Sequence, residues 1–152
     1  MEPARAAEWQ KGGFLVTTAF ARLDLEAIHG FLRESYWARG IPRATVEKSM
    51  RNSLCFGLLR GKTQIGFARV ISDRATFAYL ADVFVLPEFR GQGLAKWLME
   101  CIMAHPELQG LRRWLLFTRD AHGLYQKSGF MPLAHPERVM EIHSQAIYAR
   151  QA

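Results

Sequence analysis

One stretch in the middle of the chain decides the fold: Val83-Phe84-Val85-Leu86-Pro87-Glu88-Phe89-Arg90-Gly91-Gln92-Gly93-Leu94-Ala95. Its apolar start predicts the end of a strand, because Pro87 lacks the N–H group that a sheet requires. The glycines then allow a tight turn into a helix, whose first turn leaves about four N–H groups without intrahelical partners. The helix dipole adds positive partial charge there, so we expect an anion site at this turn, with Arg90 as a cation suited to phosphate.

Neither of two common nucleotide-binding patterns fits this turn. A Rossmann fingerprint needs a third small residue three positions after the second glycine, where this chain has Lys96. A P-loop needs Gly-Lys-Ser/Thr after four intervening residues, and that is absent. The turn therefore predicts a phosphate ligand bound in some other way.

The segment after the turn is the clearest helix of the chain. Apolar residues recur at positions i, i+3, i+4, i+7 and i+8, as Leu94, Trp97, Leu98, Cys101 and Ile102. This spacing places them on one helix face, which we interpret as core. The helix is expected to end before Pro106.

On both sides of this unit the patterns predict short strands and helices. Upstream we expect a strand at 14–20, a helix at 25–36 capped by Asp24, a helix from Pro42 to about 51, a hairpin of strands 54–60 and 64–71, and a strand at 76–86. Downstream we expect an apolar strand at 113–118 buried on both faces, a helix from a cap at Asp120 to Gly129, and a last strand at 138–142. This order predicts one mixed α/β (α+β-like) domain over residues 1–152.

Two motifs in this order resemble a known family. The pattern Arg-x-x-Gly-x-Ala at 90–95 is similar to the acyl-CoA pyrophosphate loop of the GCN5-related N-acetyltransferase (GNAT) superfamily. The block Leu124-Tyr125-Gln126-Lys127-Ser128-Gly129-Phe130 resembles that family's Leu-Tyr-x-Lys-x-Gly-Phe motif. Ser35-Tyr36-Trp37 and Asp120-Ala121-His122-Gly123 look like a bacterial branch of it. The resemblance implies a twisted, mostly antiparallel sheet of about six to seven strands flanked by about four helices.

The resemblance also implies an activity and a set of contacts. It implies transfer of an acetyl group from acetyl-CoA, a co-substrate, to a primary amine of a small molecule or peptide, by direct attack in a ternary complex and without a metal. The implied coenzyme-binding residues are Phe84, Val85, Arg90, Gly91, Gln92, Gly93, Leu94, Ala95, Lys96, Thr118, His122 and Tyr125. Thr118 departs from the family pattern, since many relatives have asparagine there.

Four side chains are candidates for chemistry or acceptor binding. Tyr125 is the implied general acid toward the leaving thiolate, and the alternative is a tyrosine that only packs. Asp82 could accept the amine's proton directly or through water; alternatively it bonds to a neighbouring backbone group while a water chain carries the proton. Tyr36 and Trp37 either line the acceptor pocket or close the core beneath the first helix.

Composition excludes several classes of protein. The 152 residues carry a formal charge of +6 and a pI near 9.7, but the basic residues are scattered, which argues against dedicated nucleic-acid binding. No apolar run approaches the roughly 18–20 residues that span a membrane. Cys55 and Cys101 have no metal-ligand spacing, so we expect buried thiols and a cytoplasmic protein. A homodimer is compatible with the resemblance, and the rival function is a non-catalytic acyl-CoA-binding or basic nucleic-acid-binding module.

Overall fold

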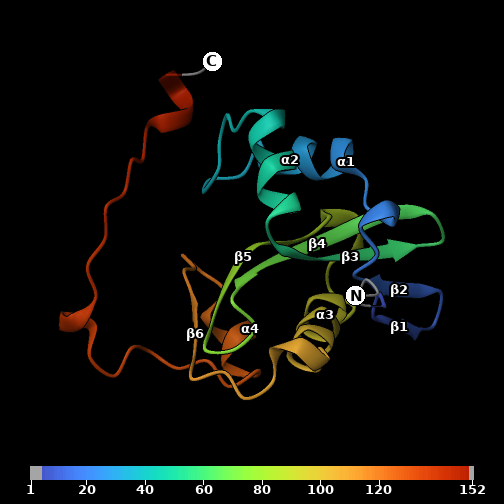
Figure 1. Ribbon diagram of the computed structural model, residues 1–152. Helices are drawn as coiled ribbons and strands as arrows, with labels where there is room; N and C mark the ends of the chain where they lie inside the picture. Colours follow the sequence, from blue (N-terminus) through green and yellow to red (C-terminus); the bar gives the residue numbers. More distant parts are fainter. Residues whose placement is uncertain (1–4, 151–152) are drawn as a thin grey trace.

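The computed structural model describes residues 5–150 and is built on one six-stranded sheet in the order β1-β2-β3-β4-β5-β6 (Figure 1). Consecutive strands pair antiparallel from β1 to β5, whereas β5 and β6 run parallel. The strands are β1 Glu8–Lys11, β2 Phe14–Thr17, β3 Leu54–Arg60, β4 Thr63–Ser72, β5 Phe77–Val85 and β6 Arg113–Leu116. The expected class, a mixed α/β fold with a mostly antiparallel sheet and about four helices, is confirmed.

Helices cover both faces of the sheet. The α-helices are α1 Leu25–Leu32, α2 Arg43–Arg51, α3 Leu94–Met103 and α4 His122–Gln126. Figure 1 shows α1 and α2 above one face, and α3 and α4 below the other. Asp24 caps α1 as predicted, since its carboxylate accepts the Ala27 N–H at 3.1 Å.

Two apolar clusters hold these layers together. The larger one joins the sheet to α3 and α4 and contains the whole predicted stripe of α3. The smaller one joins the sheet to α1 and α2 through Phe67, Phe84 and Cys55. Successive residues of a strand point to opposite faces, so β3 and β4 contribute to both clusters. The sheet is therefore covered on both sides, and its middle strands pack against both layers of helices.

Three expectations from the sequence are wrong. Strand β6 is not buried on both faces, because it lies at the sheet edge and its side chains are partly or fully exposed. The helix expected from a cap at Asp120 begins at His122: Thr118 Oγ1 accepts the Ala121 N–H at 3.0 Å, and Asp120 stays exposed. Residues 138–142 form no strand: they are exposed and pair with none of the six strands of the described chain. One strand, β1, was not expected.

No helix among residues 5–150 combines the length and apolar character needed to cross a bilayer. Both thiols are buried as predicted: Cys55 and Cys101 are 4% and 2% exposed. Burial raises the pKa of each thiol to about 12. They are therefore part of the packed interior.

Candidate functional site

The predicted turn between β5 and α3 is open. After a 3-10 turn at Pro87–Phe89, Gly91 and Gly93 adopt left-handed backbone conformations with φ of 82° and 79°. A Cβ atom built on either glycine would meet nothing within 4 Å. Left-handed conformations strain other L-residues, so glycine is required here for backbone shape and also leaves the approach clear.

The N–H groups of residues 91–96 face no backbone acceptor within residues 5–150, and the first helical bond runs from the Trp97 N–H to the Gly93 carbonyl at 3.0 Å. Two side chains of the loop donate hydrogen bonds to carbonyl groups of preceding residues. Arg90 Nε donates to the Val85 carbonyl at 2.9 Å, and Gln92 Nε2 donates to the Phe89 carbonyl at 3.1 Å. Lys96 is exposed beside them. The turn therefore presents backbone donors to open space, an arrangement suited to an anion.

Strands β5 and β6 separate next to this turn. They pair only from Phe77 opposite Arg113 to Leu80 opposite Leu116, and β5 then continues to Val85. The register of β4 with β5 shifts between Phe67 and Arg69, and Asp82 has a left-handed φ of 56°. Such a bulge bends its strand and re-aims side chains. Residues 81–85 of β5 therefore have no paired strand on the β6 side within the described part of the chain.

Tyr125 lies beside this gap, on α4. Its side chain is buried, with the residue 9% exposed, and its ring meets Phe130 edge to face at 6.1 Å. Burial, together with the nearby Tyr36 and Asp120, raises the pKa of Tyr125 to about 12. The phenol therefore keeps its proton at every physiological pH.

A cleft of about 650 Å³ opens where β5 and β6 diverge, and Tyr125 forms part of its wall. Its lining comes from the segment after α1, from α2, β4, β5, the end of β6, α4 and the C-terminal turn. Six aromatic residues contribute to it: Tyr36, Trp37, Tyr79, Phe117, Tyr125 and Tyr148. The cleft is thus assembled from parts that are distant in sequence.

Asp82 is the partly buried carboxylate of this cleft. Its two oxygens accept from Trp37 Nε1 and from Arg69 Nε, each at 2.9 Å. The Arg69 and Asp82 side chains are 15% and 11% exposed, and Arg69 also donates to Ser53 Oγ at 3.1 Å. Asp82 therefore bonds to side chains of other elements rather than to a neighbouring backbone group, and it orients Trp37 at the cleft.

Tyr36 and Trp37 are exposed at the mouth of the cleft, with 49% and 42% of their surface accessible. The Arg119 guanidinium lies 3.9 Å from the Tyr36 ring centre, and the Arg119 N–H donates to Tyr36 Oη at 3.2 Å. One face of Tyr36 thus already holds a cation from its own chain. This contact joins the segment after α1 to the loop after β6.

The chain matches proteins that share this architecture. A family model described as an acetyltransferase (GNAT) domain matches residues 51–132. The chain belongs to the GNAT superfamily. A Gibberella zeae protein named as a candidate acetyltransferase is 34% identical over 143 residues, which cover 79% of this chain and 80% of that protein.

Solved GNAT structures agree with this membership. A crystal structure of a GNAT-family candidate acetyltransferase from Xanthomonas campestris is 50% identical, with a TM-score of 0.89 over 92% of this chain and 99% of that one. N-acetylglutamate synthase from Neisseria gonorrhoeae, solved with coenzyme A and N-acetylglutamate, is 16% identical and has a TM-score of 0.67 over 84% of this chain and 30% of that one. The second likeness shows the fold alone.

The remaining predicted residues lie at the edges of the GNAT cleft. Thr118 lines the cleft, with its hydroxyl oxygen accepting the Ala121 N–H. His122 is exposed at the start of α4 and lines a neighbouring cavity with Tyr125. Phe84 and Val85 are buried at the end of β5. All the predicted residues therefore border the turn, the gap or the cleft, and their contacts with a ligand stay predictions.

Sequence reasoning missed Arg69, Arg119 and Tyr148. Arg69 and Arg119 resemble the other scattered basic residues, and only their partners Asp82 and Tyr36 distinguish them. Tyr148 lies far along the chain from the motifs, and no local pattern indicates that it reaches the cleft.

Proposed function

We propose that this GNAT protein transfers an acetyl group from acetyl-CoA to a primary amine of a small molecule or peptide. The observation that carries the proposal is the open Gly91–Gly93 turn, with its unpartnered N–H groups, directly beside the gap between β5 and β6. An anion-binding turn that borders an elongated gap suits a ligand with a diphosphate at one end and a reactive thioester at the other.

The residues present fit acetyl-CoA, which supplies the acetyl group as a thioester when bound. The N–H groups of residues 91–96 would hold its diphosphate, with Lys96 and the remaining Arg90 nitrogens adding positive charge. The end of β5 around Phe84 and Val85 would donate backbone hydrogen bonds along the gap. Thr118 and His122 border the other side.

Tyr125 is proposed as the general acid. Its raised pKa keeps a proton on Oη, and its place in the wall of both the cleft and the neighbouring cavity lets it donate that proton to a departing thiolate. A phenol that lost its proton near neutral pH would not serve this purpose. A phenol already keeps its proton at neutral pH, and burial extends this to higher pH.

The acceptor amine is proposed to occupy the aromatic cleft beside Asp82. An amine is protonated in water and must lose a proton before it attacks. Asp82 attracts the cation, and a water on its remaining lone pairs would carry the proton away, since both oxygens already accept hydrogen bonds. Exposed faces of Trp37 and the neighbouring aromatic rings favour an amine with an apolar body.

Two measurements test this function separately. Isothermal titration with acetyl-CoA is expected to show binding in the micromolar range, and a thiol-release assay with a panel of aliphatic, aromatic and peptide amines is expected to show amine-dependent release. Binding without release across the panel would contradict transfer and favour a non-catalytic acyl-CoA-binding module. Retardation of nucleic acid at physiological salt, without acetyl-CoA binding and without thiol release, would favour the basic nucleic-acid-binding module.

A further inference from the structure

The aromatic cleft beside Asp82 leaves several rings open to solvent. Tyr36 and Trp37 are exposed at its mouth and meet edge to face at 5.1 Å. Phe117, which is 65% exposed, meets Tyr79 with ring centres 5.9 Å apart. Exposed rings gathered around one cavity mark a ligand site, because a bound apolar surface would remove water from all of them at once. The cleft therefore suits a ligand that carries a planar ring.

Trp37 places this ring surface next to a carboxylate. Its indole Nε1 donates to Asp82 Oδ1 at 2.9 Å, and Arg69 Nε donates to the other Asp82 oxygen at the same distance. The indole is thus held at the group that attracts an ammonium ion. A ligand that covers Trp37 and also reaches Asp82 with an ammonium group needs only a short aliphatic linker between its ring and its nitrogen.

Among the described residues, the charged side chains that line the cleft offer no unpaired carboxylate to a second ammonium ion. They are two aspartates and two arginines, with N–O distances of 2.9 Å in the pair Arg69–Asp82 and 3.7 Å in the pair Arg119–Asp120. The Arg119 guanidinium lies 3.9 Å from the Tyr36 ring centre and occupies a ring face that another cation would use. A second positive charge at the mouth would therefore be repelled by Arg119.

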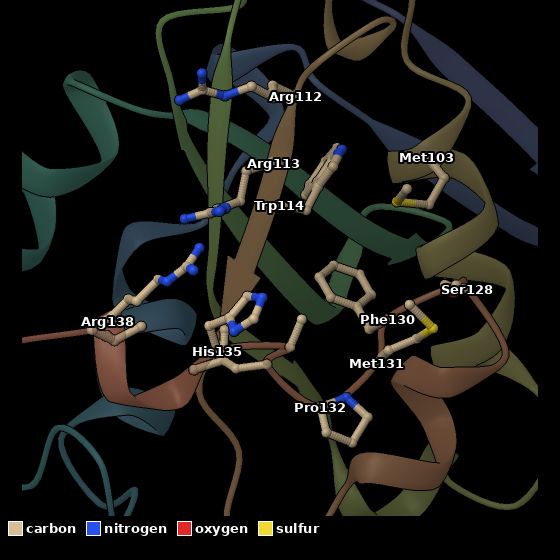
Figure 2. Close-up of a pocket in the computed structure, with 14 residues that line it drawn as sticks. Met103, Arg112, Arg113, Trp114, Ser128, Phe130, Met131, Pro132, His135 and Arg138 are labelled. Carbon is tan, nitrogen blue, oxygen red and sulfur yellow. The ribbon is translucent and has the colours of Figure 1, made fainter.

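A cavity beside β6 differs from the cleft in charge. It has a volume of about 580 Å³, and its lining contains three arginines and His135 but no acidic residue of the described chain. Figure 2 shows two of these arginines, Arg113 and Arg138, reaching toward each other near His135. This cavity repels an ammonium ion, so the cleft is the favourable place for an amine.

We propose, building on the acetyl transfer proposed above, that the acceptor is a singly charged arylalkylamine: a primary amine joined by a short aliphatic linker to a planar aromatic ring. Trp37 covers the ring, Asp82 attracts the ammonium group, and Arg119 excludes amines with a second positive charge. In the transfer, the amine nitrogen bonds to the acetyl carbon while the C–S bond breaks, which yields an arylalkyl acetamide, free coenzyme A and a proton. Trp37 and Arg119 are thus specificity-determining residues.

Amine binding to the protein saturated with coenzyme A tests the inference without turnover. Isothermal titration should show phenethylamine binding about fivefold more tightly than cyclohexylethylamine, which has the same linker but a saturated ring. The dication made by adding a para-aminomethyl group to phenethylamine should bind about 10-fold more weakly than phenethylamine itself. Equal affinity for the planar and the saturated ring, or equal affinity for the dication, would overturn the inference.

Variants assign the selection of the ring to Trp37. Trp37→Leu should abolish the preference for phenethylamine over cyclohexylethylamine, whereas Trp37→Phe, which keeps a planar ring, should retain it. Phe20→Leu is the matched control, because Phe20 is 43% exposed, like Trp37, but lies outside the cleft. A preference that survives in Trp37→Leu would contradict the role of this residue.

The exclusion of a second charge is tested at Arg119. Arg119→Gln should raise the affinity for the dication by about 10-fold, while the backbone N–H at this position can still donate to Tyr36 Oη. Arg113→Gln removes the same charge outside the cleft and should leave that affinity unchanged. Equal gains in both variants would show an effect of net charge alone and contradict the role of Arg119.

Thiol release separates this inference from the function on which it rests. Release with every amine at similar kcat/KM would overturn the arylalkylamine preference and leave acetyl transfer intact. Preferential binding of phenethylamine without release from any amine would contradict acetyl transfer and support the selection of ring and charge by the cleft.

Discussion

The turn at residues 90–96 and the aromatic cleft lie along the same strand but are built differently. The turn comes from consecutive residues and offers backbone N–H groups, so its side chains matter mainly through the glycines. The cleft comes from seven separate parts of the chain and depends on side-chain contacts such as Asp82 with Arg69 and Trp37. A local backbone site tolerates change at most positions, whereas an assembled side-chain site does not.

This difference predicts different consequences for mutations. Changes in the turn should act on coenzyme binding and leave the cleft as it is. Changes in the cleft should act on turnover or acceptor affinity and leave coenzyme binding as it is. A turn variant that changed turnover without changing coenzyme binding, or a cleft variant that changed coenzyme affinity, would contradict this separation.

The largest effect is expected from Gly93→Leu. A side chain would enter the open space before the N–H groups, and a left-handed φ would strain the residue by about 1–2 kcal/mol. Titration should show acetyl-CoA affinity reduced by about 100-fold or more. Gly110→Leu is the matched control, because Gly110 has a similar φ of 71° and equally open surroundings away from the site. Gly110→Leu should lower stability to a similar extent and bind acetyl-CoA normally. Normal acetyl-CoA binding by both variants would refute the turn as the coenzyme site.

The second-largest effect is expected from Tyr125→Phe. Loss of the proton donor should lower kcat by about 100-fold or more, with coenzyme affinity unchanged. In the wild type, the pKa near 12 means that Tyr125 produces no alkaline loss of activity below that pH. Tyr79→Phe removes a hydroxyl from the same cleft and is the control, with turnover expected within about twofold. Equal loss in both variants would point to packing rather than proton transfer.

A smaller effect is expected from Asp82→Asn. The amide can still accept from Trp37, but the ion pair with Arg69 is lost. We expect kcat/KM for the amine to fall by about 10-fold, with coenzyme binding unchanged. The control Asp73→Asn changes an exposed carboxylate whose pKa is lowered by hydrogen bonds from Thr76, Ala75 and Phe77. Asp73→Asn should leave kcat/KM unchanged, and an equally unchanged kcat/KM for Asp82→Asn would exclude the Asp82 carboxylate from proton transfer.

The smallest effect concerns the thiols, which lie outside the turn and the cleft. Because burial raises the pKa of Cys55 and Cys101 to about 12, a thiol reagent should not modify the native protein at pH 8, and both should react after unfolding. Unfolded thiols ionise near pH 8.5, so stability should be full below that pH and decline as the pH rises toward 12. Cys55→Ala and Cys101→Ala should both reduce this alkaline decline; rapid modification of the native protein would contradict the burial.

Elements that depend on neighbouring residues could be predicted from the sequence. The Asp24 cap, the α3 stripe and the Gly91–Gly93 turn follow from spacing and backbone preference, which act within a few residues. The motif at 124–130 placed Tyr125 by resemblance. The errors at β6, at the start of α4 and at residues 138–142 concern what packs beside each segment, which local spacing does not contain.

By itself, the sequence determined the order of most elements and the open glycine turn into α3, because hydrophobic period, capping and glycine conformation are properties of adjacent residues. Tertiary structure alone decided that Arg69 and Trp37 hold Asp82, that Arg119 covers Tyr36, and that Tyr148 reaches the cleft. It also left the edge of β6 and residues 131–147 uncovered. These outcomes depend on how the sheet brings distant segments together, and the interactions that select them form only when the chain is folded.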